Sequence, residues 1–299
     1  MIRPYVDRPL ADPAAAARAA AHAAAHWQLP APSPLRIGMN AIHRCGDVVL
    51  RVSSPTAPAS VSIELAEVLG AAGVATLEAA RAEVVELDGM SVTAWPFAAS
   101  PADDGDVDWP KVGRMVRLVH ELDPARLPES LPLPSPVGFA WWDFDRLLDD
   151  VADQLDDAAR AGIDGALARH RGWDTFTDAD TVVCHGDVHP GNVLIGEDGP
   201  ILIDWDLLCR APAGWDHGPL MTWTERWGGA PGVYESFASG YGRSLVGDRW
   251  AEAFAELRLV AATLMRVAAS ARDDHARPEA DRRLAWWRGD PDAPTWRAV

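Results

Sequence analysis

The stretch from residue 182 to residue 204, VVCHGDVHPGNVLIGEDGPILID, constrains the fold of this 299-residue chain more than any other. A Pro-Gly pair inside it interrupts any helix, so Asp187 and Asn192 are predicted to lie on a loop. Two short apolar runs follow, and the Gly, Asp and Pro residues between them predict a β-hairpin. The loop ends where the hairpin begins, and Asp204 follows its second strand. Asp187, Asn192 and Asp204 are therefore expected to converge at one end of the hairpin.

The spacing of these three side chains matches the requirements of phosphoryl transfer. The protein-kinase catalytic loop has the form H-R-D-x-x-x-x-N followed by D-F-G, and His185, Asp187, Asn192 and Asp204 stand at the corresponding offsets. A carboxylate there accepts or orients the proton of an attacking hydroxyl, while an amide oxygen and a second carboxylate hold Mg²⁺. A polar surface hairpin with incidental acids is the plain alternative. A metal site of His185 and His189 is disfavoured, because the Pro-Gly pair prevents the helix that would align both rings.

The segments HGDVHPGN and ILIDWD resemble the aminoglycoside phosphotransferase superfamily of protein-kinase-like enzymes, which also includes choline, homoserine and fructosamine kinases. The resemblance implies an α+β fold of two lobes. A small sheet lobe with one main helix is expected at residues 1–98, and a larger, mostly helical lobe at residues 99–299. ATP or GTP would bind between the lobes, and a small-molecule hydroxyl would be phosphorylated. Asp187 would be the catalytic base, and Asn192 and Asp204 would hold Mg²⁺.

Residues 35–53 predict three short strands joined by turns. The resemblance places the turn that covers the ATP phosphates at Gly38, although no further glycines follow it. It also places a phosphate-binding cation on the third strand, where Arg51 is the candidate because Lys111, the only lysine, lies far downstream. A guanidinium can bind phosphate with two hydrogen bonds. A surface charge on an edge strand is the alternative for Arg51.

Residues 59–72 have apolar positions at helical spacing. The family places a glutamate on this helix that pairs with the third-strand cation. Glu64 is the first choice for this role and Glu67 the second, while an ordinary solvated helix face would explain either one. Farther along, the resemblance places the hinge at Trp95 and Phe97, where backbone groups would meet the edge of the nucleotide base.

Other patterns predict the remaining elements and the substrate side. The predicted strands are 82–87 and 91–94, joined by an Asp-Gly turn, and the predicted helices are 11–27, 109–122, 141–161, 250–270 and 277–287. The proline-rich stretch 124–136 is long enough for a substrate-side loop. The Trp-rich C-terminal segment is expected to pack on the helical lobe.

Several acids are candidates for the substrate side. The helix predicted at 141–161 carries many aspartates, which either form a wall for a cationic substrate or simply line a solvated helix face. Asp206 and Glu225 are further candidate substrate contacts, and Asp206 could also approach a second Mg²⁺. Asp216 resembles the family's later aspartate, which braces the catalytic loop, and it is kept as a candidate substrate contact as well. His185 is expected to brace the loop without acting as acid or base.

The composition limits the classes of binding partner that the chain is expected to have. A net charge of −17 argues against nucleic acids and anionic membranes as binding partners, because both bind surfaces rich in Lys and Arg. The charge suits a cationic small molecule. The three cysteines form no C-x-x-C pair, and no run approaches the ~18 apolar residues of a spanning helix, so a cytoplasmic protein is expected. No protein partner is implied.

Three functions stay open at the level of sequence. A small-molecule kinase is the first. The second is a pseudokinase-like module that binds a nucleotide or metabolite without transfer, which the unusual Arg51 and the sparse glycines leave possible. The third keeps the metal site but transfers a nucleotidyl group. The intact set of Asp187, Asn192 and Asp204 favours the kinase, since a binding module has no need for all three.

Overall fold

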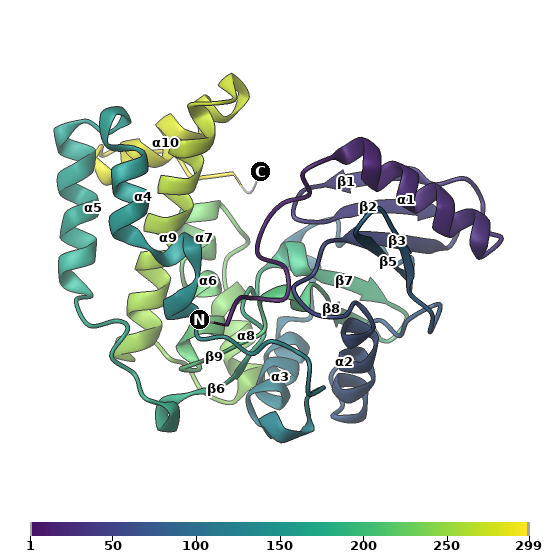
Figure 1. Ribbon diagram of the computed structural model, residues 1–299. Coiled ribbons are helices and arrows are strands. Elements are labelled where there is room, and N and C mark those ends of the chain that lie inside the picture. Colours follow the sequence, from purple (N-terminus) through teal and green to yellow (C-terminus); the bar gives the residue numbers. More distant parts are fainter. Residues whose placement is uncertain (1, 298–299) are drawn as a thin grey trace.

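A computed structural model describes residues 2–297 and shows the α+β fold that the sequence predicts. An antiparallel five-stranded sheet lies on one side of the molecule, and helices make up most of the other side (Figure 1). The strands lie in the order β1-β2-β3-β5-β4. Their bounds are Ser33–Ile37 (β1), Ala41–Cys45 (β2), Val48–Ser53 (β3), Val85–Leu87 (β4) and Met90–Pro96 (β5).

Two tight turns fix the register of this sheet. Gly46 and Asp47 join β2 to β3, and Gly46 has a φ of 65°. Asp88 and Gly89 join β4 to β5 with φ values of 52° and 74°. Positive φ at both central residues, as in the second turn, or at the first one alone, as in the first turn, gives a twist that matches that of the flanking strands. Both turns were predicted and are confirmed.

Helix α1 (Pro13–His26) covers one face of the sheet (Figure 1). Asp12 caps it by accepting hydrogen bonds from the first turn, as predicted. The buried side of this helix consists of alanines, which pack against Leu50 and Val52 of β3. Because side chains alternate along a strand, Arg51 points to the opposite face of the sheet.

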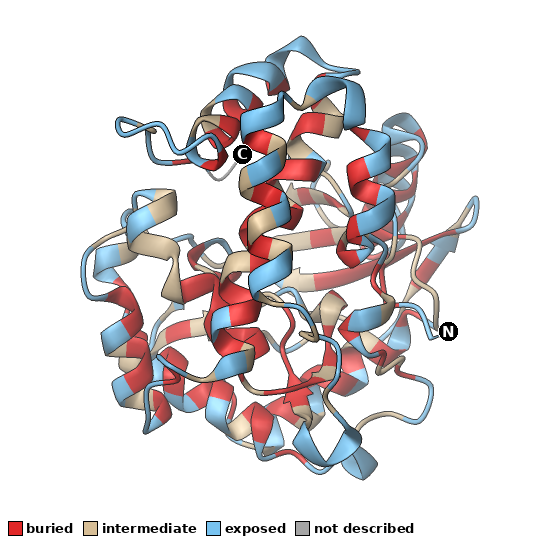
Figure 2. Cartoon of the chain, turned by 90° about the vertical axis from the view of Figure 1, so that its left-hand side faces the viewer, coloured by how far each residue is buried: buried red, intermediate tan, exposed pale blue. Residues whose placement is uncertain are grey.

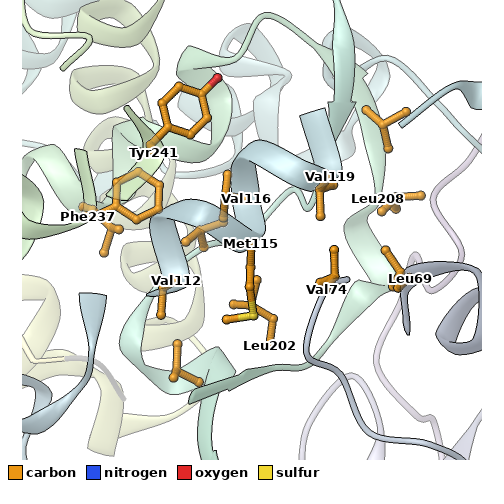
Figure 3. Close-up of a cluster of buried hydrophobic side chains, with 14 of the residues drawn as sticks. Leu69, Val74, Val112, Met115, Val116, Val119, Leu202, Leu208, Phe237 and Tyr241 are labelled. Atoms are coloured by element: carbon orange, nitrogen blue, oxygen red, sulfur yellow. The ribbon is translucent and has the colours of Figure 1, made fainter. Parts of the chain in front are cut away.

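The second helix, α2 (Ser60–Ala71), packs against the helical part of the molecule. Its buried residues share one apolar cluster with α3 (Trp109–His120) and α8 (Val233–Tyr241). A Cβ on Gly113 would lie 2.0 Å from a backbone oxygen of α8, and one on Gly240 would lie 1.9 Å from a backbone oxygen of α3, so glycine permits this close helix pair. Figure 3 shows part of this cluster, including Leu69, Val74, Val112, Met115, Val116, Val119, Leu202, Leu208, Phe237 and Tyr241.

A second apolar cluster holds the C-terminal helices α6 (Gly214–Met221), α9 (Arg249–Ser270) and α10 (Arg277–Trp287). Residues buried in the molecule lie on the sides of helices that face one another, whereas exposed residues face outward (Figure 2). The cluster is rich in aromatic rings, among them Trp142, Trp215, Phe254, Trp287 and Trp296. The predicted packing of the Trp-rich C-terminal segment is confirmed, as are both C-terminal helices.

The single helix predicted at residues 141–161 is wrong. The segment forms two helices, α4 (Phe144–Asp150) and α5 (Asp157–Arg169). Asp143 accepts a hydrogen bond from the first turn of α4, and Asp156 does the same for α5. Two aspartates that start helices thus lie within one acidic run, and an apolar period alone does not reveal the break between them.

The remaining elements are short. They are β6 (Val182–Cys184), β7 (Val193–Gly196), β8 (Gly199–Leu202), β9 (Cys209–Ala211) and α7 (Trp223–Trp227). Strand β6 pairs with β9, and β7 pairs with β8. Within residues 2–297, none of the helices is long and apolar enough to cross a bilayer.

Candidate functional site

The predicted loop and hairpin are confirmed. Strands β7 and β8 pair with Val193 opposite Leu202, and the N–H of Ile203 donates to the carbonyl of Asn192 across 3.1 Å, which closes the open end of the hairpin. The side-chain Nδ2 of Asn192 donates to the backbone oxygen of Asp187 across 2.9 Å and lies 3.4 Å from its carboxylate oxygen Oδ2. The hairpin thus brings the ends of the 185–204 segment together.

Asp187 lies among cations. Arg258 of α9 donates from Nη1 to Oδ1 of Asp187 across 2.8 Å, and Nε2 of His189 lies 3.4 Å from Oδ2. Burial alone would raise the pKa of Asp187, but the charge and hydrogen bond of His189 and the charge of Arg258 outweigh it and hold that pKa far below its usual range. Asp187 is therefore an ionised carboxylate that can accept a hydrogen bond from a hydroxyl.

Asp216 braces the loop from beneath. It is fully buried and accepts hydrogen bonds from the backbone N–H groups of His185 and Gly186, each across 2.8 Å, and Nε2 of His120 lies 3.0 Å from it. Burial raises the pKa of Asp216, but His120 and the other donors outweigh burial and lower it. A direct contact between Asp216 and a substrate is contradicted by this burial. The bracing position that the resemblance implied agrees with these bonds.

The backbone at Gly186 requires glycine. Its φ is 98°, and a Cβ there would lie 2.0 Å from the backbone oxygen of Leu207. The neighbouring His185 accepts from the N–H of Asp187 at Nδ1, so Nε2 carries the proton and donates to the carbonyl of Ile203 across 3.0 Å. Burial lowers the pKa of His185, which keeps the ring neutral. These contacts are structural, in line with the expected bracing role.

His120, Cys184 and Asp216 also form a buried group of metal-ligand types. The carboxylate oxygens of Asp216 already accept three hydrogen bonds, and burial raises the pKa of Cys184. A neutral thiol is a poor metal ligand. This group is better described as a part of the brace than as a metal site.

Asp204 and Asp206 face the sheet. Asp204 adopts a left-handed backbone conformation with φ and ψ both 65°, which is uncommon for a residue other than glycine. Its side chain is open to solvent on one side. Surrounding protein nevertheless raises the pKa of Asp204, and the nearby charges of Asp206 and Asp187 raise it further, while Arg51 opposes them. A cation bound beside Asp204 would favour its ionised form.

The carboxylate that pairs with Arg51 is Asp206, whereas sequence reasoning named Glu64, with Glu67 as second choice. Asp206 is buried and also accepts a hydrogen bond from the side chain of Asn40 across 2.8 Å. Both glutamates are exposed on α2. The apolar side of α2 is buried in the cluster that also holds residues of α3 and α8, and its charged side is left to solvent.

A second cation shares the face of the sheet that carries Arg51. Arg36 of β1 pairs in register with Ile42, which in turn pairs with Arg51, and residues directly opposite one another point to the same face. The charge of Arg36 acts on Asp204 and lowers its pKa. Sequence reasoning named Arg51 alone and missed Arg36.

The predicted hinge residues differ in their contacts. Trp95 lies opposite Val49 of β3, on the same face as Arg51, and its Nε1 donates to Thr93 across 2.9 Å. The N–H of Phe97 donates to the carbonyl of Asp47 across 2.8 Å, so this group is not available to a nucleotide base. A base contact through the amide of Phe97 is therefore contradicted, because the end of β5 is tied to the turn that follows β2.

The β1–β2 turn consists of Gly38, Met39 and Asn40. The N–H of Gly38 donates to the carbonyl of Asn40 across 2.9 Å, and a Cβ on Gly38 would meet open space. The turn thus reaches Asp206 through the side chain of Asn40. Glu225, the last candidate, is exposed on α7.

The donor set suits Mg²⁺. The side-chain Nδ2 of Asn192 donates to the backbone oxygen of Asp187, so the side-chain amide oxygen Oδ1 is left for another partner. Carboxylate and amide oxygens are the ligands that Mg²⁺ prefers, and the neighbouring carboxylates Asp204 and Asp206 raise each other's need for a cation, as the raised pKa of Asp204 indicates. Asn192 and Asp204 are the residues that would hold it, with Asp206 close by.

Sequence reasoning also missed Arg258. Its position in the helix predicted at 250–270 places it four residues after the buried Phe254, and hence on a side of the helix that packs inward. An arginine on the buried side of a helix was the feature of the sequence that could have identified Arg258 as a candidate. The sequence did not show which distant carboxylate would meet it.

Comparisons with known proteins agree with this geometry. The model of the phosphotransferase enzyme family matches residues 2–254. Spectinomycin phosphotransferase in complex with ADP and spectinomycin is similar in structure, with a TM-score of 0.64 and 18% identity over 86% of this chain and 89% of that chain. The fold is the kinase-like fold of these proteins.

Two further solved structures are similar. APH(2″)-IIIa in complex with GDP and kanamycin has a TM-score of 0.62 and 16% identity, covering 88% of this chain and 94% of that chain. A choline/ethanolamine kinase family protein from Mesorhizobium loti has a TM-score of 0.56 and 18% identity, covering 86% and 87%. No curated protein sequence matches significantly. On the extent of the family match, the chain belongs to the phosphotransferase enzyme family.

Proposed function

We propose that this phosphotransferase moves the γ-phosphoryl group of ATP to a hydroxyl of a small molecule, with GTP as the alternative donor. The observation that carries the proposal is the ionised Asp187 on a braced loop, bonded to Asn192, together with the pair of Arg51 and Asp206 just after Asp204. Such an arrangement supplies a proton acceptor, oxygen ligands and a phosphate-binding cation in one place. The proposed division is a nucleotide-binding lobe at 1–98 and a catalytic lobe at 99–299.

Asp187 orients the acceptor hydroxyl and takes its proton. The hydroxyl oxygen forms a bond to the γ-phosphorus while the bond from that phosphorus to the β,γ-bridging oxygen breaks. The electron pair of the broken bond leaves with ADP, and the proton passes through Asp187 to solvent. Because the transition state of such transfers is loose, positioning and charge neutralisation supply most of the rate increase.

The cations of the sheet hold the triphosphate in this proposal. Arg51 and Arg36 share one face, and both act on Asp204. Nucleotide phosphates would take the place of Asp206 as partner of Arg51, and Asn40 would be released with it. Mg²⁺ held by Asn192 and Asp204 would neutralise charge on the phosphates.

The acceptor is proposed to be a small hydroxylated molecule, with aminoglycosides and other cationic compounds as the first class to test. The chain's net charge of −17 supports a cationic acceptor. The acids at residues 143–157 give weaker support than expected, because Asp143 and Asp156 serve as helix caps and pair with Arg146 and Arg288. Antibiotic inactivation would follow only if an antibiotic proves to be the best acceptor.

The test is ADP release from Mg-ATP across a panel of aminoglycosides, choline, homoserine and amino sugars. Asp187→Asn should lower turnover by ~10²–10⁴, the scale of losing a general base, while calorimetric binding of Mg-ATP survives. Asp198→Asn is the matched control, because that acid is exposed at the tip of the β7–β8 hairpin. Equal turnover in wild type and Asp187→Asn would remove Asp187 from the reaction.

Two other functions predict different products. A nucleotide-binding module would bind Mg-ATP without releasing ADP for any acceptor, and the braced, ionised Asp187 argues against it. A nucleotidyl transferase would release pyrophosphate and add a nucleoside monophosphate to the acceptor. The mass of the product separates both from a kinase.

A further inference from the structure

We infer that Arg258 of α9 is a positioning residue that holds one carboxylate oxygen of Asp187 and leaves the other to accept the proton of the acceptor hydroxyl. This role rests on the proposed phosphoryl transfer. It gives α9, which lies far from the loop in sequence, a part in the reaction. None of the motif residues supplies the same contact.

Arg258 contacts two adjacent residues of the loop with one guanidinium. Nη1 donates to Oδ1 of Asp187 across 2.8 Å, and Nη2 donates to the carbonyl of Gly186 across 3.0 Å. A planar guanidinium presents these N–H groups in a fixed relative direction. Holding the backbone and the side chain together fixes the rotation of the carboxylate as well as its charge.

The two oxygens of Asp187 are held unequally. Oδ1 receives the short charge-assisted bond from Arg258, whereas Oδ2 has only the longer approaches of His189 and Asn192, both at 3.4 Å. Charge-assisted bonds of normal length are about twice as strong as neutral ones, and bonds weaken as the distance grows. Oδ2 is therefore the oxygen that can turn to an incoming hydroxyl.

Arg258 is itself held in place. Its guanidinium lies over the ring of Trp215 at 5.1 Å from the ring centre, and Nε1 of Trp215 donates to the same carbonyl of Gly186 across 3.0 Å. Helices α6 and α9 approach closely, since a Cβ on Gly214 would lie 2.6 Å from the backbone of Ala251. This close packing fixes the distance of α9 from the loop. The position of Arg258 is therefore determined by the packed core.

A positioning role predicts a specific pattern of kinetic losses. Arg258→Ala should lower kcat by ~10², the cost of a displacement of about 1 Å at a reacting group, with KM for Mg-ATP unchanged. Arg258→Lys should have a kcat between those of wild type and Arg258→Ala. The ammonium group can contact Oδ1 of Asp187 or the carbonyl oxygen of Gly186, but it cannot hold both as the guanidinium does. Added guanidinium chloride at millimolar concentration should raise the turnover of Arg258→Ala.

The experiment measures ADP release with the best acceptor found for the full-length chain, together with Mg-ATP calorimetry and thermal unfolding. Arg249→Ala is the matched control: it lies on the same helix, is exposed and stacks on Trp250 at 4.0 Å. Wild-type kcat in Arg258→Ala, or an equal loss in kcat and Mg-ATP affinity, would overturn the inference. If Arg258→Ala does not fold, Arg258→Lys with kcat equal to wild type overturns it as well.

The outcomes separate this inference from the proposed function. A wild type that releases no ADP for any acceptor rejects the phosphoryl transfer and, with it, the role of Arg258. A wild type that turns over while Arg258→Ala does so equally well rejects Arg258 alone. Selective loss of kcat with rescue by guanidinium supports the inference.

Discussion

The 185–204 segment and the face of the sheet that carries Arg51 and Arg36 form two halves of the same candidate site, yet their contacts differ in kind. In the first, the decisive contacts are local: Asn192 bonds Asp187 five residues away, and the hairpin closes between neighbouring strands. In the second, the decisive contact joins Arg51 to Asp206, which lies 155 residues away. The motif residues of the first half lie in one short stretch of sequence that Asp216 and Arg258 then brace, whereas the second half depends entirely on how distant segments pack.

This difference explains which residues could be assigned early. A Pro-Gly pair and turn residues restrict local backbone geometry, so offsets within the loop carry spatial meaning. The partner of Arg51 depends instead on which side of α2 is buried. Because the apolar side of α2 is buried in the same cluster as α3 and α8, its glutamates are left to solvent, and the partner of Arg51 is Asp206.

The largest effect is expected on stability, at the buried contacts between Asp216 and the 185–204 segment. Asp216→Ala would leave the N–H groups of His185 and Gly186 and the ring of His120 without their buried acceptor. Removing one partner of such a buried set should lower the free energy of unfolding by about 3–5 kcal/mol. Urea denaturation measures this loss, and turnover should fall with it because the loop loses its brace.

Asp198→Ala serves as the comparison, since it also removes an aspartate but from an exposed position on the hairpin. Its free energy of unfolding should stay within ~0.5 kcal/mol of wild type. A similar loss in the two variants would show that the buried bonds of Asp216 do not hold the loop.

The second effect tests the long-range half through nucleotide affinity. Arg51→Ala removes a cation that would bind phosphate, and a lost bond to a charged group costs about 1.5–3 kcal/mol. The Kd for Mg-ATP should therefore rise ~10–100-fold by calorimetry, at 1.4 kcal/mol for each factor of ten. Asp187 and its loop contacts stay intact in this variant.

Glu64→Ala and Glu67→Ala sharpen the same comparison. Both glutamates are exposed on α2, so neither change should alter nucleotide affinity. A loss of affinity in Glu64→Ala as large as that in Arg51→Ala would mean that α2 turns toward the sheet when nucleotide binds, with Glu64 in place of Asp206 as the partner of Arg51.

The extent of successful prediction follows the same physical division. Turn chemistry located the Gly46-Asp47 and Asp88-Gly89 turns, and capping located the start of α1 at Asp12. The segment 141–161 failed because an aspartate can cap a helix or line its surface, and only packing decides between them. Asn40, Arg36 and Arg258 were missed for a related reason: each meets its partner through tertiary structure, which has no local signature.

The smallest expected effect is on the pH dependence of stability, to which Asp204 and Asp216 contribute with opposite signs. The pKa of Asp204 is raised, first by its protein surroundings and then by Asp206, so between the ordinary carboxylate range and that raised pKa the folded protein binds a proton that the unfolded chain has lost. The stability of the metal-free protein should therefore fall as pH rises through this window. The pKa of Asp216 is lowered, so its contribution has the opposite sign and is lost only as pH falls.

Asp204→Asn should remove the first of these slopes and raise the urea midpoint of the metal-free protein above the window, with little change below it. Added Mg²⁺ should stabilise wild type more at high pH, where Asp204 is ionised, and should stabilise Asp204→Asn less, because a ligand that binds only the folded state adds to its stability. Urea titrations from about pH 4 to about pH 8, with and without Mg²⁺, cover the range from the ordinary pKa of an aspartate to pH values above the raised pKa of Asp204. Parallel pH slopes in wild type and Asp204→Asn would show that the crowded acids around Asp204 do not strain the folded protein, and Mg²⁺ would then have no excess charge to relieve there.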